Sequence, residues 1–235
     1  MEKSKQTQDE VLLYEPKELL DARLQRRSFL KYAGASAAGI ALVAAGCKKD
    51  RDQDHGLRLG EGDIGILNYA YALEQLEAAF YTKVADTPNS GLSSSEAALF
   101  VDIRDHEIAH REFFKAALRD KAIIPLEVDF GAINFTSRDS ILSTAKAFED
   151  LGVSAYNGAG RLIKNPEYLL LAGKIVSVEA RHAALIRDLI SNGSFADNSV
   201  VDSNGLDTSR GPGQVLSIAQ AYIKTPISIT GLPNY

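Results

Sequence analysis

The sequence predicts an all-α protein: an antiparallel four-helix bundle with one long crossover connection and a loop-rich C-terminal tail. From residue 63 to about residue 193, apolar residues recur at three- and four-residue steps, as they do in amphipathic helices. Clusters of proline, glycine and asparagine divide this stretch into four segments of helical length. The first and third segments share a pattern, and so do the second and fourth. The chain therefore contains two related helical hairpins.

The first hairpin has clear start and stop signals. Its first helix begins at Asp63, and the turn residues 88–91 (PNSG) end it. Ser93 and Glu96 form a capping-box pattern, which opens the second helix. The connection that follows, around residues 124–135, is long enough to cross from one end of a bundle to the other.

The second hairpin begins with a third helix that starts between residues 136 and 139. Asn165 and Pro166 then supply an N-cap and a first-turn proline for the fourth helix. We expect this helix to end at Asn192–Gly193, because glycine commonly follows the last helical turn. These limits place the bundle at residues 63–193. The tail, residues 194–235, is loop-rich and has one short helical pattern at 214–222, so we expect it to lie along the bundle.

The first 46 residues predict an export signal. Arg26 and Arg27 precede Ser-Phe-Leu-Lys in a pattern that resembles the twin-arginine motif. The apolar run that follows is shorter than the roughly 20 residues that span a bilayer. It ends in Ala-Ala-Gly-Cys47, which resembles a bacterial lipobox. We expect a periplasmic or cell-envelope protein, anchored to the membrane by a lipid on Cys47, with residues 47–62 as a tether. The alternative is an amphipathic N-terminal helix with an unmodified cysteine.

Composition excludes several classes of protein. The chain has 235 residues and a formal net charge of −5, so it offers no basic surface for nucleic acid. Its single cysteine excludes an internal disulfide, a cysteine-rich zinc site and a rubredoxin-type iron centre. Only four histidines are present. Any bound metal must therefore be held by carboxylates and these few imidazoles.

Carboxylates and histidines interrupt the apolar stripes at equivalent places in both hairpins. The second and fourth helices each carry a Glu-x-x-His pair, whose two side chains share one helix face. The first and third helices each carry a glutamate followed by a tyrosine seven residues later. Four ionised carboxylates in a bundle core are unfavourable unless they are compensated, and two divalent cations would balance their charge. The residues are Glu107 and His110, Glu179 and His182, Glu74 and Tyr81, and Glu149 and Tyr156.

The stretches ILNYAYALEQLEAAFY, HEIAHREFF, AFEDLGVSAYNGA and VSVEARHAALI resemble the ferritin-like superfamily, and most closely bacterial ferritin-like proteins related to plant desiccation-associated proteins. The resemblance implies two iron or two manganese ions, because carboxylate and imidazole ligands accept either metal. It also implies two bridging glutamates, two terminal glutamates and one histidine for each ion. In that order, these are Glu107 and Glu179, Glu74 and Glu149, and His110 and His182. Tyr81 and Tyr156 would be neighbours of these ligands.

Two residues leave alternatives open. Glu77 lies one turn from Glu74 and is the alternative ligand on the first helix. The internal repeat favours Glu74, because Glu77 aligns with Gly152, which has no side chain. His106 completes an HExxH pattern with His110, as in zinc proteases. That interpretation leaves the second Glu-x-x-His pair unexplained, so we expect His106 at the rim of the site.

The resemblance implies a di-metal protein that reacts with O2 or peroxide, with ferroxidase-, peroxidase- or manganese-catalase-like chemistry. Such a protein would act in iron handling or in oxidative-stress handling. The competing interpretation is a non-catalytic stress-related or interaction module that retains the ferritin-like fold and keeps a metal, or only the fold, for stability. A lipid anchor and an irregular tail argue against a closed storage cage, although they are compatible with a small homo-oligomer.

Overall fold

The computed structural model describes residues 56–233. The predicted export motif at Arg26 and Arg27, the lipidation site at Cys47 and most of the tether lie outside these residues. Within the described part of the chain, no helix combines the length and the apolar character needed to span a membrane.

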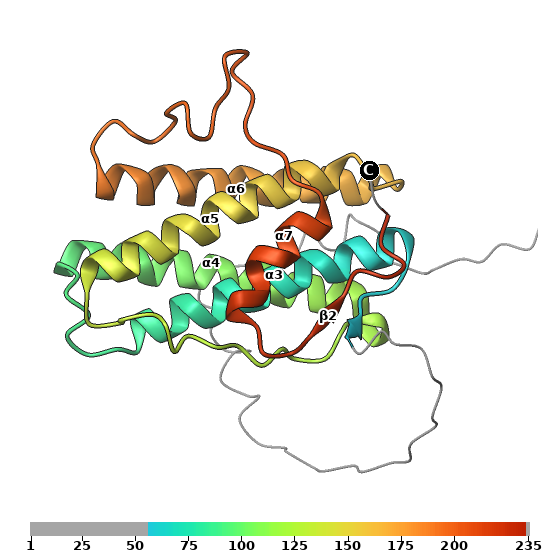
Figure 1. The fold of residues 1–235 in the computed structure, drawn as a ribbon, viewed down its shortest axis with the longest axis horizontal. Coiled ribbons are helices and arrows are strands. Elements are labelled where there is room, and N and C mark those ends of the chain that lie inside the picture. Colours follow the sequence, from blue (N-terminus) through green and yellow to red (C-terminus); the bar gives the residue numbers. More distant parts are fainter. Residues whose placement is uncertain (1–55, 234–235) are drawn as a thin grey trace, which may run out of the picture. The chain divides into compact units, whose positions relative to one another are not determined.

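Four long helices dominate the structure (Figure 1). They are α3 (Gly62–Ala85), α4 (Ser94–Leu118), α5 (Arg138–Gly160) and α6 (Pro166–Ile190). The shorter elements are η1 (Arg119–Lys121), α7 (Pro212–Ala219), η2 (Gln220–Tyr222) and two strands, β1 (Leu57–Arg58) and β2 (Ile227–Ser228), which pair in parallel. The all-α prediction is confirmed. The strand pair was not predicted, because two residues are too few to show a period of two.

Local capping signals set two of the helix starts as predicted. The Ser93 hydroxyl accepts a hydrogen bond from the Glu96 N–H at 3.3 Å, and the Glu96 carboxylate accepts one from the Ser93 N–H at 2.8 Å. Asn165 accepts from the Glu167 N–H at 2.9 Å, with Pro166 in the first turn. Each of these bonds satisfies an N–H that lacks a partner within its helix.

Three predicted boundaries differ from the structure by one to three residues. The first helix begins at Gly62 rather than at Asp63. The fourth helix ends at Ile190 rather than at Asn192–Gly193, because Ser191 is already extended and Gly193 turns the chain with a φ of +86°. The short tail helix begins at Pro212, where a proline fits the first helical position. The α-helix ends at Ala219, and the 3-10 helix η2 follows it directly, up to Tyr222.

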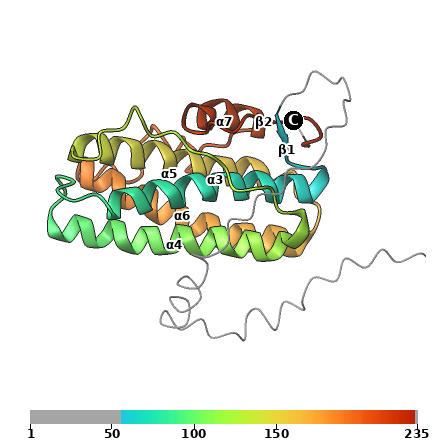
Figure 2. The same cartoon turned by 90° about the horizontal axis from the view of Figure 1, so that it is seen from below.

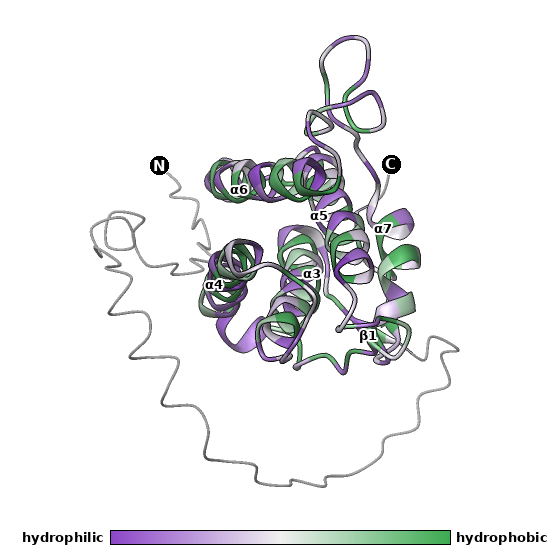
Figure 3. Cartoon of the chain, turned by 90° about the vertical axis from the view of Figure 1, so that its left-hand side faces the viewer, coloured by the Kyte–Doolittle hydropathy of each residue, from purple (hydrophilic) through white to green (hydrophobic). Residues whose placement is uncertain are grey.

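Helix α3 occupies the middle of the bundle. It packs closely against α4 and also contacts α5, while α5 packs against α6 (Figures 2 and 3). Every residue from 65 to 78 is buried. A helix enclosed on all sides needs apolar residues around its whole circumference, and any polar side chain there must find a partner.

Two buried polar residues of α3 hold the connection between α4 and α5. The Asn68 amide donates to the Lys121 carbonyl and accepts from the Ile123 N–H, both at 2.9 Å. The Gln75 side-chain oxygen accepts from the Leu126 N–H at 2.8 Å. These bonds supply partners to backbone groups at the end of η1 and in the irregular segment that follows it.

The tail is fixed to α5 and α6 by two arginines. Arg210 donates to Ser154 of α5 through its backbone N–H at 3.0 Å and its guanidinium at 2.6 Å. Arg187 of α6 is buried, pairs with both carboxylate oxygens of Asp150 at 2.8 and 2.7 Å, and reaches Ser199 of the tail at 3.1 Å. Hydrogen bonds donated by a charged guanidinium, as in these contacts with Ser154 and Ser199, fix a loop that has little apolar surface to bury.

Candidate metal centre

The six predicted ligands meet in the interior of the bundle, although they come from four helices. Glu74 lies on α3 and Glu149 on α5, while α4 and α6 each present a Glu-x-x-His pair. The four carboxylates are at most 1% exposed. The histidine side chains are slightly more open, at 13% for His110 and 6% for His182.

The side chains form two groups that share two carboxylates. In each group, one ligand atom per residue lies within 4.8 Å of all the others. Glu107 and Glu179 belong to both groups. Glu74 and His110 complete the first group, and Glu149 and His182 complete the second.

The two shared carboxylates each direct one oxygen toward each histidine. Nδ1 of His110 lies 2.8 Å from Oε1 of Glu179 and 3.7 Å from Oε2 of Glu107. Nδ1 of His182 lies 2.9 Å from Oε1 of Glu107 and 3.3 Å from Oε2 of Glu179. Both carboxylates therefore divide their oxygens between the two groups, as a carboxylate that bridges two ions must.

The terminal carboxylates use their two oxygens differently. Oε2 of Glu74 lies 3.4 Å from Nδ1 of His110, and Oε2 of Glu149 lies 3.5 Å from Nδ1 of His182. The other oxygen, Oε1, accepts a hydrogen bond from a tyrosine of the opposite hairpin: Tyr156 donates to Glu74 and Tyr81 donates to Glu149. Each tyrosine thus leaves one carboxylate oxygen directed at the centre.

The converging atoms fit a pair of cations. All eight of them are buried and lack a hydrogen bond, despite their short separations. Ligand atoms at right angles around an ion, each at about 2.1 Å, lie roughly 3 Å apart. Short contacts without hydrogen-bond geometry are what lone pairs directed at a common ion produce. The atoms are Nδ1 of His110 and His182, Oε2 of Glu74 and Glu149, and both oxygens of Glu107 and Glu179.

Without cations, the cluster retains protons. Burial and the charge of Glu179 raise the pKa of Glu107 to about 8. Burial alone would raise the pKa of Glu179, but its contacts with the two histidines outweigh this and lower it to about 2. Burial would likewise lower the histidine pKa values. The surrounding carboxylates outweigh it, raising the pKa of His182 to about 12 and that of His110 well above its ordinary range.

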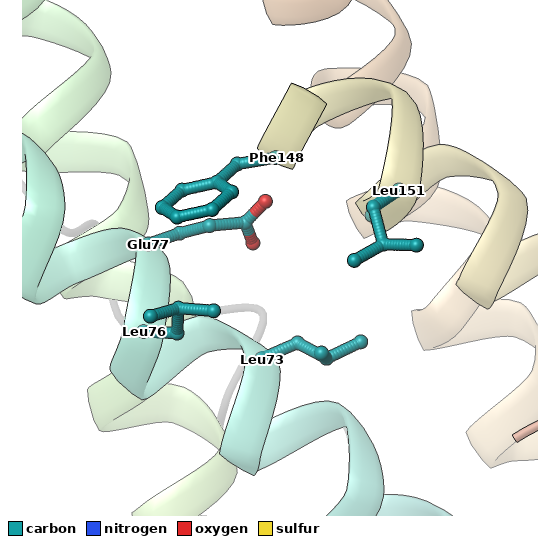
Figure 4. A pocket seen from close by; sticks show the side chains of 6 residues that line it. Leu73, Leu76, Glu77, Phe148 and Leu151 are labelled. Carbon is teal, nitrogen blue, oxygen red and sulfur yellow. The ribbon is translucent and has the colours of Figure 1, made fainter. Parts of the chain in front are cut away.

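Glu77 lies outside both groups. Its carboxyl points toward α5, where it lines a cavity of about 10 Å³ with leucine and phenylalanine side chains (Figure 4). Gly152 makes room for it, because a Cβ at that position would lie 3.1 Å from Oε1 of Glu77. Burial, followed by repulsion from the cluster carboxylates, raises the pKa of Glu77 well above its usual value. The geometry thus agrees with the preference for Glu74 as the ligand.

His106 lies outside both groups as well. It is exposed on α4, its ring lies parallel to that of His182 at an interplanar angle of 7°, and its Nδ1 is 2.9 Å from Nε2 of His182. The HExxH pattern therefore does not place two histidines on one ion here. His106 instead contacts Nε2 of His182, the ring nitrogen that faces away from the centre. The sequence did not predict this contact.

The family model for the ferritin-like domain matches residues 62–192, a stretch that contains all four long helices and all six predicted ligands. A search of curated proteins gave no match.

Proposed function

Because the chain belongs to the ferritin-like domain family, we propose that its four long helices bind two iron or two manganese ions that react with O2 or peroxide. One observation carries the proposal: Glu107 and Glu179 each divide their oxygens between two groups of buried ligand atoms. Two divalent cations would bring four positive charges to four carboxylates, which removes the cost of burying them. Such a pair supplies electrons to O2 or peroxide when it contains iron, or disproportionates peroxide when it contains manganese.

The surrounding side chains keep the terminal ligands oriented and dry. Tyr81 and Tyr156 are buried, and each fixes the terminal glutamate of the other hairpin. Phe100 packs against Tyr81 and Phe114 against Tyr156, with ring centroids 5.5 and 6.5 Å apart. These rings exclude water from the hydrogen bonds and so strengthen them. A tyrosine in this place is also close enough to exchange a proton with Glu149 or Glu74.

We extend the proposal to the architecture. The α3–α4 and α5–α6 pairs would be antiparallel hairpins, with residues 119–137 crossing the bundle between them. Close packing within each pair and the short connections at 86–93 and 161–165 support this arrangement. The limits of the signal, tether, bundle and tail, and a small homo-oligomer, remain predictions.

The decisive experiment measures metal and reaction together. Anaerobic protein with Fe(II) should bind about two ions per chain and develop the near-ultraviolet absorption of ferric iron once O2 or peroxide is added. The same protein with Mn(II) should be assayed for O2 release from peroxide. Rapid release with manganese and slow oxidation of iron would favour the catalase-like reaction. Absence of stoichiometric binding, or binding without turnover of either metal, would favour the non-catalytic module.

We also propose that the chain is exported by the twin-arginine pathway and anchored through Cys47. The order of the motifs in residues 26–47 supports this. Globomycin should cause a larger precursor to accumulate, and Cys47→Ser should release the protein into a soluble fraction. A soluble wild-type protein whose mature N-terminus lies elsewhere would contradict the lipid anchor.

A further inference from the structure

We propose that His106 makes the two metal positions unequal, by accepting a hydrogen bond from Nε2–H of His182 and thereby holding Nδ1 of His182 toward the centre. This inference rests on the proposed function, because it concerns how tightly each of two ions is bound. His106 is a positioning residue, since it lies outside both groups of ligand atoms.

The geometry of the two rings supports this role. Nδ1 of His106 lies 2.9 Å from Nε2 of His182, while Nδ1 of His182 lies among the oxygens of Glu107, Glu149 and Glu179. A neutral imidazole has one N–H and one lone pair, so a proton on Nε2 leaves Nδ1 free to bind a cation. A partner that accepts this N–H fixes the ring and makes its other nitrogen a better ligand.

The internal repeat shows that the other half of the site lacks an equivalent. Aligning Glu107-x-x-His110 with Glu179-x-x-His182 places His106 opposite Val178, which cannot accept a hydrogen bond. The His110 side chain is also more exposed than that of His182, at 13% against 6%. The His182 position should therefore fill first and bind its ion more tightly, and the His110 position should be the weaker and more open of the two.

The test uses titration calorimetry to compare the stepwise binding of Mn(II) by the wild-type protein and by three variants. His106→Val copies the residue found in the repeat and should weaken one of the two binding steps by about 10- to 100-fold, leaving the other unchanged. His106→Asn should restore most of the affinity, because its side-chain oxygen takes the place of Nδ1. Asp102→Asn changes an exposed residue one turn away on α4 and should have no effect.

A spectroscopic readout separates positioning from general loss of structure. In the Co(II)-loaded protein, the imidazole N–H of His182 should give a shifted proton signal that exchanges slowly with water. The signal should persist in His106→Asn and broaden or vanish in His106→Val. Since His106 is exposed, the metal-free variants should have the same melting temperature as the metal-free wild-type protein.

The outcomes distinguish this inference from the proposed function. If wild-type protein binds no metal, the proposed function fails. If it binds two ions and His106→Val binds them with the same two affinities and the same N–H exchange, only the role of His106 is refuted. Equal weakening by His106→Val and His106→Asn would also refute it, because the hydrogen-bond acceptor would then be irrelevant.

Discussion

Acidification should weaken metal binding steeply, because protons and metal ions compete for the same atoms. At pH 7 the metal-free cluster holds protons on Glu107, whose pKa is about 8, on His182, whose pKa is about 12, and on His110, whose pKa is raised well above its ordinary range. Binding two ions requires ionised carboxylates and neutral imidazoles. All three protons must therefore leave, together with any proton on Glu149, because burial raises the pKa of that carboxyl as well.

The expected magnitude follows from this proton count. If about three protons leave as the pair of ions binds, the overall constant for binding both ions should rise about 1,000-fold per pH unit between pH 6 and 7.5. Glu107 loses its proton around pH 8, and well above that pH the proton is gone. The dependence should then fall to about 100-fold per pH unit, the share of the two histidines.

Titration calorimetry with Mn(II) measures the proton count directly. At each pH, the binding enthalpy is compared in two buffers with different ionisation enthalpies, and the difference gives the number of protons released. A count of one or fewer between pH 6 and 7.5 would refute the reasoning, since the cluster would then already be deprotonated. A count that stays constant from pH 7 to pH 9 would show that no carboxyl of the cluster titrates near pH 8.

Four further substitutions test stability and ligand choice. Because the pKa of Glu77 is raised in the folded protein, its contribution to the free energy of unfolding is greatest below pH 4.5 and is lost as the pH rises. Glu77→Gln should therefore raise the melting temperature of the metal-free protein at pH 7, have no effect below pH 4.5 and leave two ions bound. Glu74→Ala, by contrast, should reduce the metal content. Glu96 is held at a pKa of about 2, mainly by Arg138, so Glu96→Gln should cost about 1 kcal/mol in urea unfolding at pH 7, a loss that disappears as pH falls toward 2. Arg187→Met removes the partner of a carboxylate on α5 and should cost about 2 kcal/mol while exposing the tail to proteases; an unchanged digestion pattern would contradict its anchoring role.

Much of the fold could be predicted from local signals. The period of the apolar residues and the caps at Ser93 and Asn165 identify helices and their starts, because both effects depend on residues within one turn. The bonds from Asn68 and Gln75 to the connection could not be predicted. They join residues about fifty positions apart, and the sequence around a buried amide does not indicate which loop the amide binds.

The site could be predicted in composition but not in its contacts. The repeated Glu-x-x-His pairs identify which side chains share a face, since residues three apart are neighbours on a helix. The repeat does not show that Tyr81 reaches Glu149 and Tyr156 reaches Glu74. Each tyrosine lies seven residues after the glutamate of its own helix, yet donates to the glutamate of the other hairpin. Only the packing of α3 against α5 sets that exchange.

The positions where the repeat fails carry their own information. Glu77 aligns with Gly152, and the structure places the two against each other, so that one side chain occupies the space the other position leaves open. A glutamate at both positions would put two carboxyls into a cavity of about 10 Å³, room for about one water. His106 aligns with Val178 in the same way, and within residues 56–233 an imidazole partner is found for His182 alone of the two predicted ligand histidines. The six predicted ligands follow the repeat, as the proposed pair of ions would require, because two ions need two similar sets of donors. The surrounding residues are under no such constraint, and there the two halves of the chain differ.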